Sequence, residues 1–307
     1  MRKRDEKRRV GVNPPRGLTL LLWPLVCALA IAPALAATGD VPFVPTPMNV
    51  VDAMLDIAHV NEKDFVIDLG SGDGRIVIAA AKKRGAHGLG VELDGALVND
   101  ARREAQRQGV ANKVEFVAQN LFVTDIDRAT VLTSYLFPRV NMQLRPVIFA
   151  QLKPGSRVVS HEFDFGSWKP DAQVTVKVPD KPYGPPRSEV FLWIVPANAA
   201  GRWQWRTQLE GGVPVDCEMT LEQTFQELRG TAIAGGKPAA LENPRLRGEE
   251  IRFTLVADVN GRKVRQEVSA RVSGDSIKGK ARAPHAESGF GFHATRIAQG
   301  KINIEKE

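Results

Sequence analysis

The sequence predicts an α/β domain, with helices on both faces of a mostly parallel sheet, followed by a smaller all-β domain. Two observations support this. From residue 65 to residue 161, runs rich in β-branched residues alternate with helical stretches, and this alternation is typical of a parallel sheet. From about residue 201 the helical periodicity gives way to short alternating apolar runs separated by turn residues.

The α/β part can be divided into elements by its apolar runs and its turn residues. The expected strands are residues 65–68, 88–92, 114–118, 130–134 and 157–161. The helices expected between them are residues 75–84, 95–108 and 140–152, and Gly109 and the Lys153-Pro154-Gly155 turn mark two of their ends. A closing antiparallel pair, residues 174–178 and 189–195, brackets a proline-rich loop and completes a domain of residues 61–196.

A leading segment, residues 37–60, precedes this domain. Its prolines at positions 42, 45 and 47 predict an extended stretch. Thr46 is expected to cap a helix with Pro47 at the first position. The buried stripe of that helix is expected to comprise Val50, Val51, Met54, Leu55 and Ala58.

Residues 201–300 predict a small antiparallel barrel or sandwich. Apolar residues alternate, as in Val215, Cys217, Met219 and Leu221, and Asn260-Gly261 and Gly274-Asp275 supply hairpin turns. No catalytic constellation is visible in this region. It is expected to be either a binding module for a cell-envelope partner or a stabilising appendage.

Residues 1–36 are typical of an export signal. A basic region is followed by an apolar stretch from Leu18 to Ala32 and by Ala34-Leu35-Ala36, a small-x-small cleavage site. The protein is therefore expected to be periplasmic or secreted, with an uncleaved membrane anchor as the alternative. The segment also carries most of the formal net charge of +7, because 35 basic and 33 acidic residues remain without it, a net charge of +2. A nearly neutral remainder argues against nucleic acid as a partner.

Cysteine and histidine give no sign of a metal site. After removal of the signal one cysteine remains, Cys217, so no internal disulfide is possible. The five histidines are scattered without ligand spacing. His161-Glu162 begins like a zinc-protease motif, but Phe165 stands where the second histidine would be.

The most informative stretch is Asp68-Leu69-Gly70-Ser71-Gly72-Asp73-Gly74-Arg75, between the first strand and the first helix of the sheet. A strand that turns through glycines into a helix is a common ligand-binding turn. The dinucleotide fingerprint requires a glycine where Arg75 stands. Asp68 and Asp73 would repel a pyrophosphate, whereas they suit a ligand with a cationic part.

Other polar side chains fall at the ends of the expected strands. Glu92 ends the second strand 24 residues after Asp68, close to the spacing of about 20 expected for an acid that binds ribose hydroxyls. Asn120, Tyr135 and His161 follow or end later strands. The carboxyl ends of parallel strands meet at one edge of a sheet, so these residues are expected to share a site.

The glycine motif and Gly90-Val91-Glu92 resemble the seven-strand, Rossmann-like S-adenosylmethionine-dependent methyltransferases. The resemblance implies that Asp68 orients the methionine part of this cofactor, that Gly70 and Gly72 let the backbone approach it, and that Glu92 accepts both ribose hydroxyls. Asn120 replaces the usual aspartate at the adenine amino group and can still accept that hydrogen bond. Three neighbouring residues complete the expected cofactor site: Ser71, Gly74 and Leu121.

Tyr135-Leu136-Phe137-Pro138 stands where amino-directed methyltransferases of this superfamily place an aromatic and proline motif beside the transferred methyl group. The Asn-Pro-Pro-Tyr motif of nucleic-acid amino methyltransferases is absent. Tyr135 and His161 are the candidate catalytic residues, and simple packing is the alternative for each. Asn141 and Arg145 are expected to form a solvated helix face or a substrate edge.

Within the superfamily, the chain is most similar to the exported or membrane-associated bacterial relatives of the lysine methyltransferases of ATP synthase c-subunit and adenine nucleotide translocase. This implies methyl transfer to an amine such as a protein lysine. Because S-adenosylmethionine is made in the cytosol and the signal directs the chain out of it, the alternative is a non-catalytic envelope scaffold. A small-molecule methyltransferase is a second alternative, and Arg75 and the nearby carboxylates disfavour an NAD-dependent oxidoreductase.

Overall fold

The computed structural model describes residues 43–305, with the exception of residues 183, 210–213, 285 and 287. The expected export signal therefore lies outside the described residues. In the described part of the chain, no helix is both long and apolar enough to span a bilayer.

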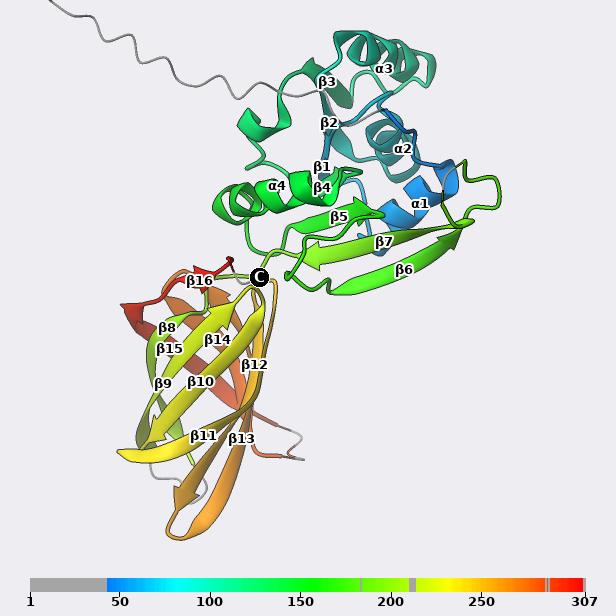
Figure 1. Cartoon of the computed structure of the whole chain (residues 1–307). Coiled ribbons are helices and arrows are strands. Elements are labelled where there is room, and N and C mark those ends of the chain that lie inside the picture. The colour runs from blue at the N-terminus through cyan, green and yellow to red at the C-terminus, as the bar shows by residue number, and fades with distance from the viewer. Residues whose placement is uncertain (1–42, 183, 210–213, 285, 287, 306–307) are drawn as a thin grey trace, which may run out of the picture. The chain divides into compact units, whose positions relative to one another are not determined.

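The α/β part is built on a seven-stranded sheet in the order β3-β2-β1-β4-β5-β7-β6 (Figure 1). The first five strands are parallel, β7 is antiparallel to β5, and β6 is antiparallel to β7. The strands are β1 (Phe65–Leu69), β2 (His87–Glu92), β3 (Val114–Ala118), β4 (Val131–Ser134), β5 (Arg157–His161), β6 (Ala172–Lys177) and β7 (Arg187–Ile194). The strand order reverses between β1 and β4, which is where ligands bind on sheets of this kind.

Helices cover both faces of this sheet (Figure 1). Successive strand residues point to opposite sides, so they pack against different helices. The helical elements are α1 (Met48–Ile57), α2 (Arg75–Arg84), α3 (Gly95–Arg107), the short 3₁₀ helix η1 (Leu121–Val123) and α4 (Pro138–Gln151). Val66 of β1 packs in the apolar cluster that contains residues of α1 and α2. The next residue, Ile67, packs in the cluster that contains Leu144 and Ile148 of α4.

The start of α1 corrects one expectation. Pro47, not Thr46, is the N-cap residue, and no side chain caps the helix. The Thr46 hydroxyl instead lies 3.2 Å from Nδ1 of His161, a residue far away in the sequence. A tertiary contact has replaced the local capping bond, and it ties the leading segment to the end of β5.

The C-terminal part is a closed antiparallel barrel, so the structure decides between the barrel and the sandwich. Sequential strands pair from β8 to β15, β15 pairs with β8, and the short strand β16 (Ile302–Asn303) adds parallel to β9. The barrel strands are β8 (Gly201–Gln208), β9 (Pro214–Thr224), β10 (Glu227–Ala234), β11 (Lys237–Arg247), β12 (Glu250–Val259), β13 (Arg262–Ser273), β14 (Ser276–Arg282) and β15 (Phe290–Gln299).

The alternating residues expected to face inward do so. Cys217, Met219 and Leu221 are all buried in one apolar cluster of the barrel, and Val215 packs against it partly buried. Burial raises the pKa of the Cys217 thiol to about 12, which leaves it protonated and unreactive at neutral pH. The turn at Asn260-Gly261 has positive φ at both residues, 52° and 81°, as a tight hairpin of the expected kind requires.

Candidate functional site

The glycine turn between β1 and α2 is shaped by three left-handed residues. Gly70, Gly72 and Gly74 have φ values of 75°, 53° and 78°, a conformation that side chains with a Cβ rarely adopt. The Gly70 and Ser71 N–H groups donate to the Val91 carbonyl oxygen at 2.8 and 2.9 Å. The turn is thereby fastened to β2, at the carboxyl edge of the sheet.

The leading segment lies directly over this turn. A Cβ added at Gly72 would be 2.3 Å from Cε2 of the Phe43 ring, so only glycine permits the approach. The Arg75 guanidinium donates to the Thr46 carbonyl oxygen at 2.9 Å and forms an ion pair with Asp73. Arg75 therefore holds the leading segment against the turn.

Asp68 is the buried acid of the site, with only 2% of its surface exposed. Its Oδ1 accepts a hydrogen bond of 2.7 Å from the Thr133 hydroxyl on β4. Burial raises the pKa of Asp68 to about 7; the Thr133 bond lowers it, and the charges of Glu92 and Asp73 raise it further. The carboxyl group lacks a cationic partner, since no ion pair involves Asp68 among the described residues.

Glu92 lies at the end of β2 and faces the glycine turn. Its Oε2 accepts from the Gly72 N–H at 2.9 Å, and its Oε1 accepts from the Leu93 and Asp94 N–H groups at 2.7 and 3.1 Å. These backbone donors fix the carboxylate beside the turn. The structure therefore brings together the two acids that the sequence placed on different strands.

Asn120 and Leu121 lie at the end of β3, next in the sheet to β2. Asn120 Oδ1 accepts from the Phe122 N–H at 2.9 Å and caps η1, whose first residue is Leu121. The Gln119 N–H donates to the Glu92 carbonyl oxygen at 2.8 Å, which places this loop beside Glu92.

Tyr135 and His161 are in contact at the carboxyl ends of β4 and β5. Their ring centroids are 4.0 Å apart, and the Tyr135 ring also stacks on Phe163 at 6.2 Å. Burial, and secondarily the charge of Glu162, raises the pKa of Tyr135, so the phenol is neutral at physiological pH. Tyr135 is half-buried, so part of its surface is accessible.

His161 has the environment of a packed residue. It is 1% exposed, and its Nδ1 and Nε2 lie 3.2 and 3.0 Å from the hydroxyl oxygens of Thr46 and Ser188. Burial lowers the pKa of His161 to about 4, against a raising effect of the Glu162 charge and a further lowering by Lys181. Both nitrogens are engaged, which fits the packing alternative better than a general base.

Asn141 and Arg145 are neither a solvated face nor a substrate edge, because both are buried. The Asn141 amide donates to the Phe163 and Asp164 carbonyl oxygens at 3.2 and 3.1 Å, and Arg145 donates to the Phe165 carbonyl oxygen at 3.2 Å. They hold the loop that follows β5. The spacing of two polar residues on one helix face does not show whether a loop will cover them.

Several residues that sequence reasoning missed also contribute to this edge. Thr133 binds Asp68, and the buried hydroxyl of the neighbouring Ser134 has no hydrogen-bond partner within the described residues. Glu162 adopts a left-handed φ of 66° and pairs with Lys181 of the proline-rich loop. The positions of Thr133 and Ser134 at a strand end could have suggested them, whereas the Glu162–Lys181 pair depends on the β6–β7 hairpin.

Comparison with known proteins agrees with this geometry. Residues 68–172 match the family described as the ANTKMT methyltransferase domain. A protein-lysine N-methyltransferase of Saccharolobus islandicus is 42% identical over 50% of this chain and 94% of its own length. The lysine N-methyltransferase of the ATP synthase c-subunit from Xenopus laevis is 34% identical over 50% of this chain and 67% of its own length.

Among solved structures, an RNA methyltransferase from Salinibacter ruber in complex with S-adenosyl-L-homocysteine is 52% identical, with a TM-score of 0.45, over 49% of this chain and 93% of that one. The family match, residues 68–172, lies within the α/β part and includes the glycine turn and both acids. The chain belongs to the ANTKMT family of S-adenosylmethionine-dependent methyltransferases.

Proposed function

We propose that this enzyme methylates the ε-amino group of a protein lysine at the carboxyl edge of the seven-stranded sheet. The observation that carries the proposal is the similarity, over 94% of the relative's length, to a protein named as a protein-lysine N-methyltransferase. The relative from Xenopus laevis is also named as a lysine N-methyltransferase. The site offers an aromatic, half-buried surface at Tyr135, which suits the long apolar stem of a lysine.

The residues present fit S-adenosylmethionine. The buried Asp68 carboxyl has a raised pKa and would be stabilised in its charged form by the cationic methionine part of the cofactor. The buried hydroxyls of Ser71 and Ser134 lack partners in the described structure and can bond a polar ligand. Gly70 and Gly72 present backbone without Cβ atoms at the same place.

Glu92 and Asn120 are assigned to the nucleoside part. A carboxylate has about four lone-pair sites, so Glu92, which already accepts from three backbone donors, has about one site left for a ribose hydroxyl. Asn120 Oδ1 bonds one N–H group and has a second lone pair for the adenine amino group. Leu121, next to Asn120, is assigned to the same part of the ligand. Gly74 is buried against β3 and α3, where an added Cβ would be 2.5 Å from Phe116 and 2.8 Å from Ala101, so we assign it to the packing of the turn. Each of these roles is a proposal that variants can test.

S-adenosylmethionine supplies a methyl group that its sulfonium has already activated. The protein must then align the acceptor nitrogen with it, and such positioning can contribute roughly 7 to 11 kcal/mol. An acceptor lysine must also be neutral, against a usual pKa of about 10.4, so a desolvated aromatic surface favours the reactive form. The neutral Tyr135 hydroxyl can accept a hydrogen bond from the amine and orient it. His161, which contacts the Tyr135 ring, is assigned to positioning that ring.

Methyl transfer can be tested with radiolabelled S-adenosylmethionine and a cell-envelope protein extract, with extracted RNA as a separate acceptor. Label that is released by protease, resists ribonuclease and yields methyl-lysine after hydrolysis would support the proposal. A Glu92→Gln variant should transfer little or no label. Label found only on RNA or only on small molecules would contradict a protein-lysine acceptor.

We also propose that residues 1–36 direct the enzyme out of the cytosol, and that the mature chain begins near Ala37. The basic, apolar and small-x-small regions of the sequence support this. Fractionation of cells that express the full chain, followed by N-terminal sequencing, tests it. A full-length chain in the cytosolic fraction would contradict export, whereas a full-length chain in the membrane fraction would identify an uncleaved anchor.

A further inference from the structure

Glu162, the residue that follows β5, is held in an unusual turn. Its φ of 66° is left-handed, and across it the Phe163 N–H donates to the His161 carbonyl oxygen at 2.8 Å. This is a γ-turn of the rare and strained kind. The Glu162 N–H also donates to the Glu189 carbonyl oxygen on β7 at 2.7 Å, which fixes the turn. Strained backbone of this kind gathers at functional sites, so Glu162 is a candidate for a role in the reaction.

The Glu162 carboxylate lies beside the aromatic surface that is assigned above to the acceptor. Its Oε1 is 3.7 Å from Nε2 of His161, whose ring contacts the Tyr135 ring, and its charge adds to the effect of burial in raising the pKa of Tyr135. Burial by itself raises the pKa of Glu162, but hydrogen bonds from Lys181 and Ser188 and nearby positive charge lower it overall. The group is therefore a carboxylate at neutral pH, next to the ring at which the acceptor amine is expected.

A lysine of the chain itself binds this carboxylate. Lys181 lies in the loop between β6 and β7, and its ammonium group forms an ion pair with Glu162 Oε1. The same ammonium group donates to the Arg187 carbonyl oxygen at 2.7 Å, and the Lys181 N–H donates to the Val178 carbonyl oxygen at 3.1 Å. The structure therefore shows that the position beside Glu162 accepts the ammonium group of a lysine.

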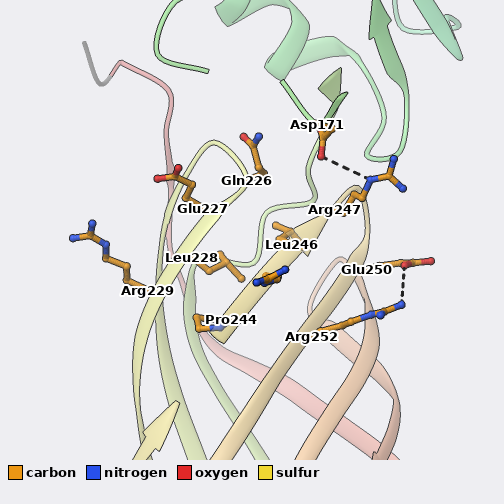
Figure 2. Close-up of a pocket in the computed structure, with 11 residues that line it drawn as sticks. Asp171, Gln226, Glu227, Leu228, Arg229, Pro244, Leu246, Arg247, Glu250 and Arg252 are labelled. Atoms are coloured by element: carbon orange, nitrogen blue, oxygen red, sulfur yellow. Dashed lines mark ion pairs between the residues drawn. The ribbon is translucent and has the colours of Figure 1, made fainter. Parts of the chain in front are cut away.

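This ion pair is more shielded than the pairs on the outer surface of the barrel. A groove of about 650 Å³ lies there along β10, β11 and β12, and Figure 2 marks the ion pair between Glu250 and Arg252 within it. These two side chains are 60% and 70% exposed, whereas those of Glu162 and Lys181 are 20% and 11% exposed. Exposed pairs are screened by water and salt and contribute little, whereas shielded pairs are screened much less. Glu162 therefore holds a cation more firmly than Glu250 does.

We propose that Glu162 receives the ammonium group of the acceptor lysine, and that Lys181 occupies this position until the acceptor displaces it. This role rests on the lysine methylation proposed above. It belongs to the binding of the charged lysine and precedes the loss of its proton. Exchange of one ammonium group for another keeps the shielded carboxylate paired, and an unpaired charge there would be costly. Lys181 lies outside the ladder of β6 and β7, so its displacement leaves the pairing of these strands intact.

An ion pair that only fastens the loop would make its two residues equivalent. Glu162→Gln and Lys181→Gln remove the same pair, so both variants would then change acceptor binding in the same direction. Competition for the carboxylate predicts opposite effects, because loss of Glu162 removes the site of the acceptor ammonium and loss of Lys181 removes its competitor. The signs of the two effects therefore separate the two roles.

The test measures binding of Nα-acetyl-lysine methylamide to the full chain in excess S-adenosyl-L-homocysteine, by ligand-observed NMR. Nα-acetyl-norleucine methylamide, which has the same hydrocarbon stem without the ammonium group, is the neutral comparison. Lys83→Gln is the matched control for Lys181→Gln, because it makes the same change in charge and Lys83 forms an exposed ion pair with Asp52 at 2.6 Å. Far-UV circular dichroism checks that each variant is folded, and calorimetry with S-adenosyl-L-homocysteine checks the cofactor site.

The unmodified chain is expected to bind the lysine probe more tightly than the norleucine probe. Glu162→Gln should weaken binding of the lysine probe about tenfold, and Lys181→Gln should strengthen it about threefold, while Lys83→Gln leaves it unchanged. The proposal is overturned if the two probes bind equally, or if the Glu162 and Lys181 variants do not shift the affinity in opposite directions.

The same variants are carried through the radiolabel assay described above, which separates this role from the proposed function. The expected pattern of affinities without label on lysine would refute the protein-lysine acceptor and leave the ammonium site in place. Label on lysine without that pattern would refute the role of Glu162 alone.

Discussion

The charge of Asp68 gives a sharp test of how the site is built. Asp68 is 2% exposed, and burial raises its pKa from 3.8 to about 7. An acid whose folded pKa is raised stabilises the fold least when it is charged, so the protein should lose stability as the pH rises from about 4 to about 7. Asp68→Asn removes this charge and leaves an oxygen to which the Thr133 hydroxyl can still donate. The variant should therefore be more stable than the unmodified chain at neutral and alkaline pH.

The size of the effect follows from the two pKa values. Near pH 8, where Asp68 is charged in both the folded and the unfolded state, the rise of its pKa from 3.8 to about 7 lowers the free energy of unfolding by about 4 kcal/mol. Near pH 5 Asp68 is charged only in the unfolded state, and the same linkage gives a loss of about 2 kcal/mol in the free energy of unfolding. The advantage of Asp68→Asn should therefore shrink by about 2 to 3 kcal/mol on acidification over this range.

The assay is urea unfolding at both pH values, with hydrogen exchange of peptides from β1 and β4 to report on the α/β part separately from the barrel. Asp64→Asn is the control: this acid is also buried, but it is paired with Arg157, so its removal should destabilise the fold. The reasoning fails if Asp68→Asn is no more stable than the unmodified chain near pH 8, or if its advantage does not depend on pH.

Further predictions concern the same edge of the sheet. Calorimetry should find S-adenosylmethionine binding about tenfold tighter near pH 8 than near pH 6, because the cation requires a charged Asp68; a flat profile would contradict this role. Gly72→Ala should displace the Phe43 ring and weaken cofactor binding at least tenfold, with faster proteolysis of the leading segment; unchanged affinity would contradict the close approach. Asn141→Ala should lower the free energy of unfolding by about 1 to 3 kcal/mol, because it removes two hydrogen bonds to carbonyl groups of the loop after β5, and urea unfolding measures this. Because the pKa of His161 is lowered to about 4, the free energy of unfolding should fall by about 3 kcal/mol as the pH falls from 6.5 to 4. His161→Gln should abolish this fall in acid unfolding, and an equal fall in the variant would show that His161 is not buried in its neutral form.

The sequence was sufficient for the parts of this protein that depend on local patterning. The alternation of strands and helices predicted a parallel sheet, and the structure confirms it. Because strand ends meet at one edge, Asp68 and Glu92 could be placed together without coordinates, and in the structure they end the paired strands β1 and β2, close enough for the charge of Glu92 to raise the pKa of Asp68. The alternation of inward-facing residues in the barrel could be predicted equally well, as the burial of Cys217 and Met219 shows.

The predictions that were wrong concern polar residues whose hydrogen-bond partners come from a distant segment of the chain. Thr46 was expected to cap a helix, and it lies beside His161 instead, because the fold brings the two together across 115 positions. Asn141 and Arg145 were expected to be exposed or to face a substrate, and they bond the loop after β5. Hydrogen bonds of this kind form after packing, so no local pattern announces them.

The sequence by itself thus determined the fold class, the glycine turn and the two acids beside it, because backbone conformation and side-chain alternation are local properties. Only the tertiary structure decided that the β-domain closes as a barrel and that Lys181 pairs with Glu162. Both depend on pairing between strands that are distant in the sequence, β8 with β15 in the barrel and β5 with β7 in the sheet, and such pairing is a property of the assembled sheet.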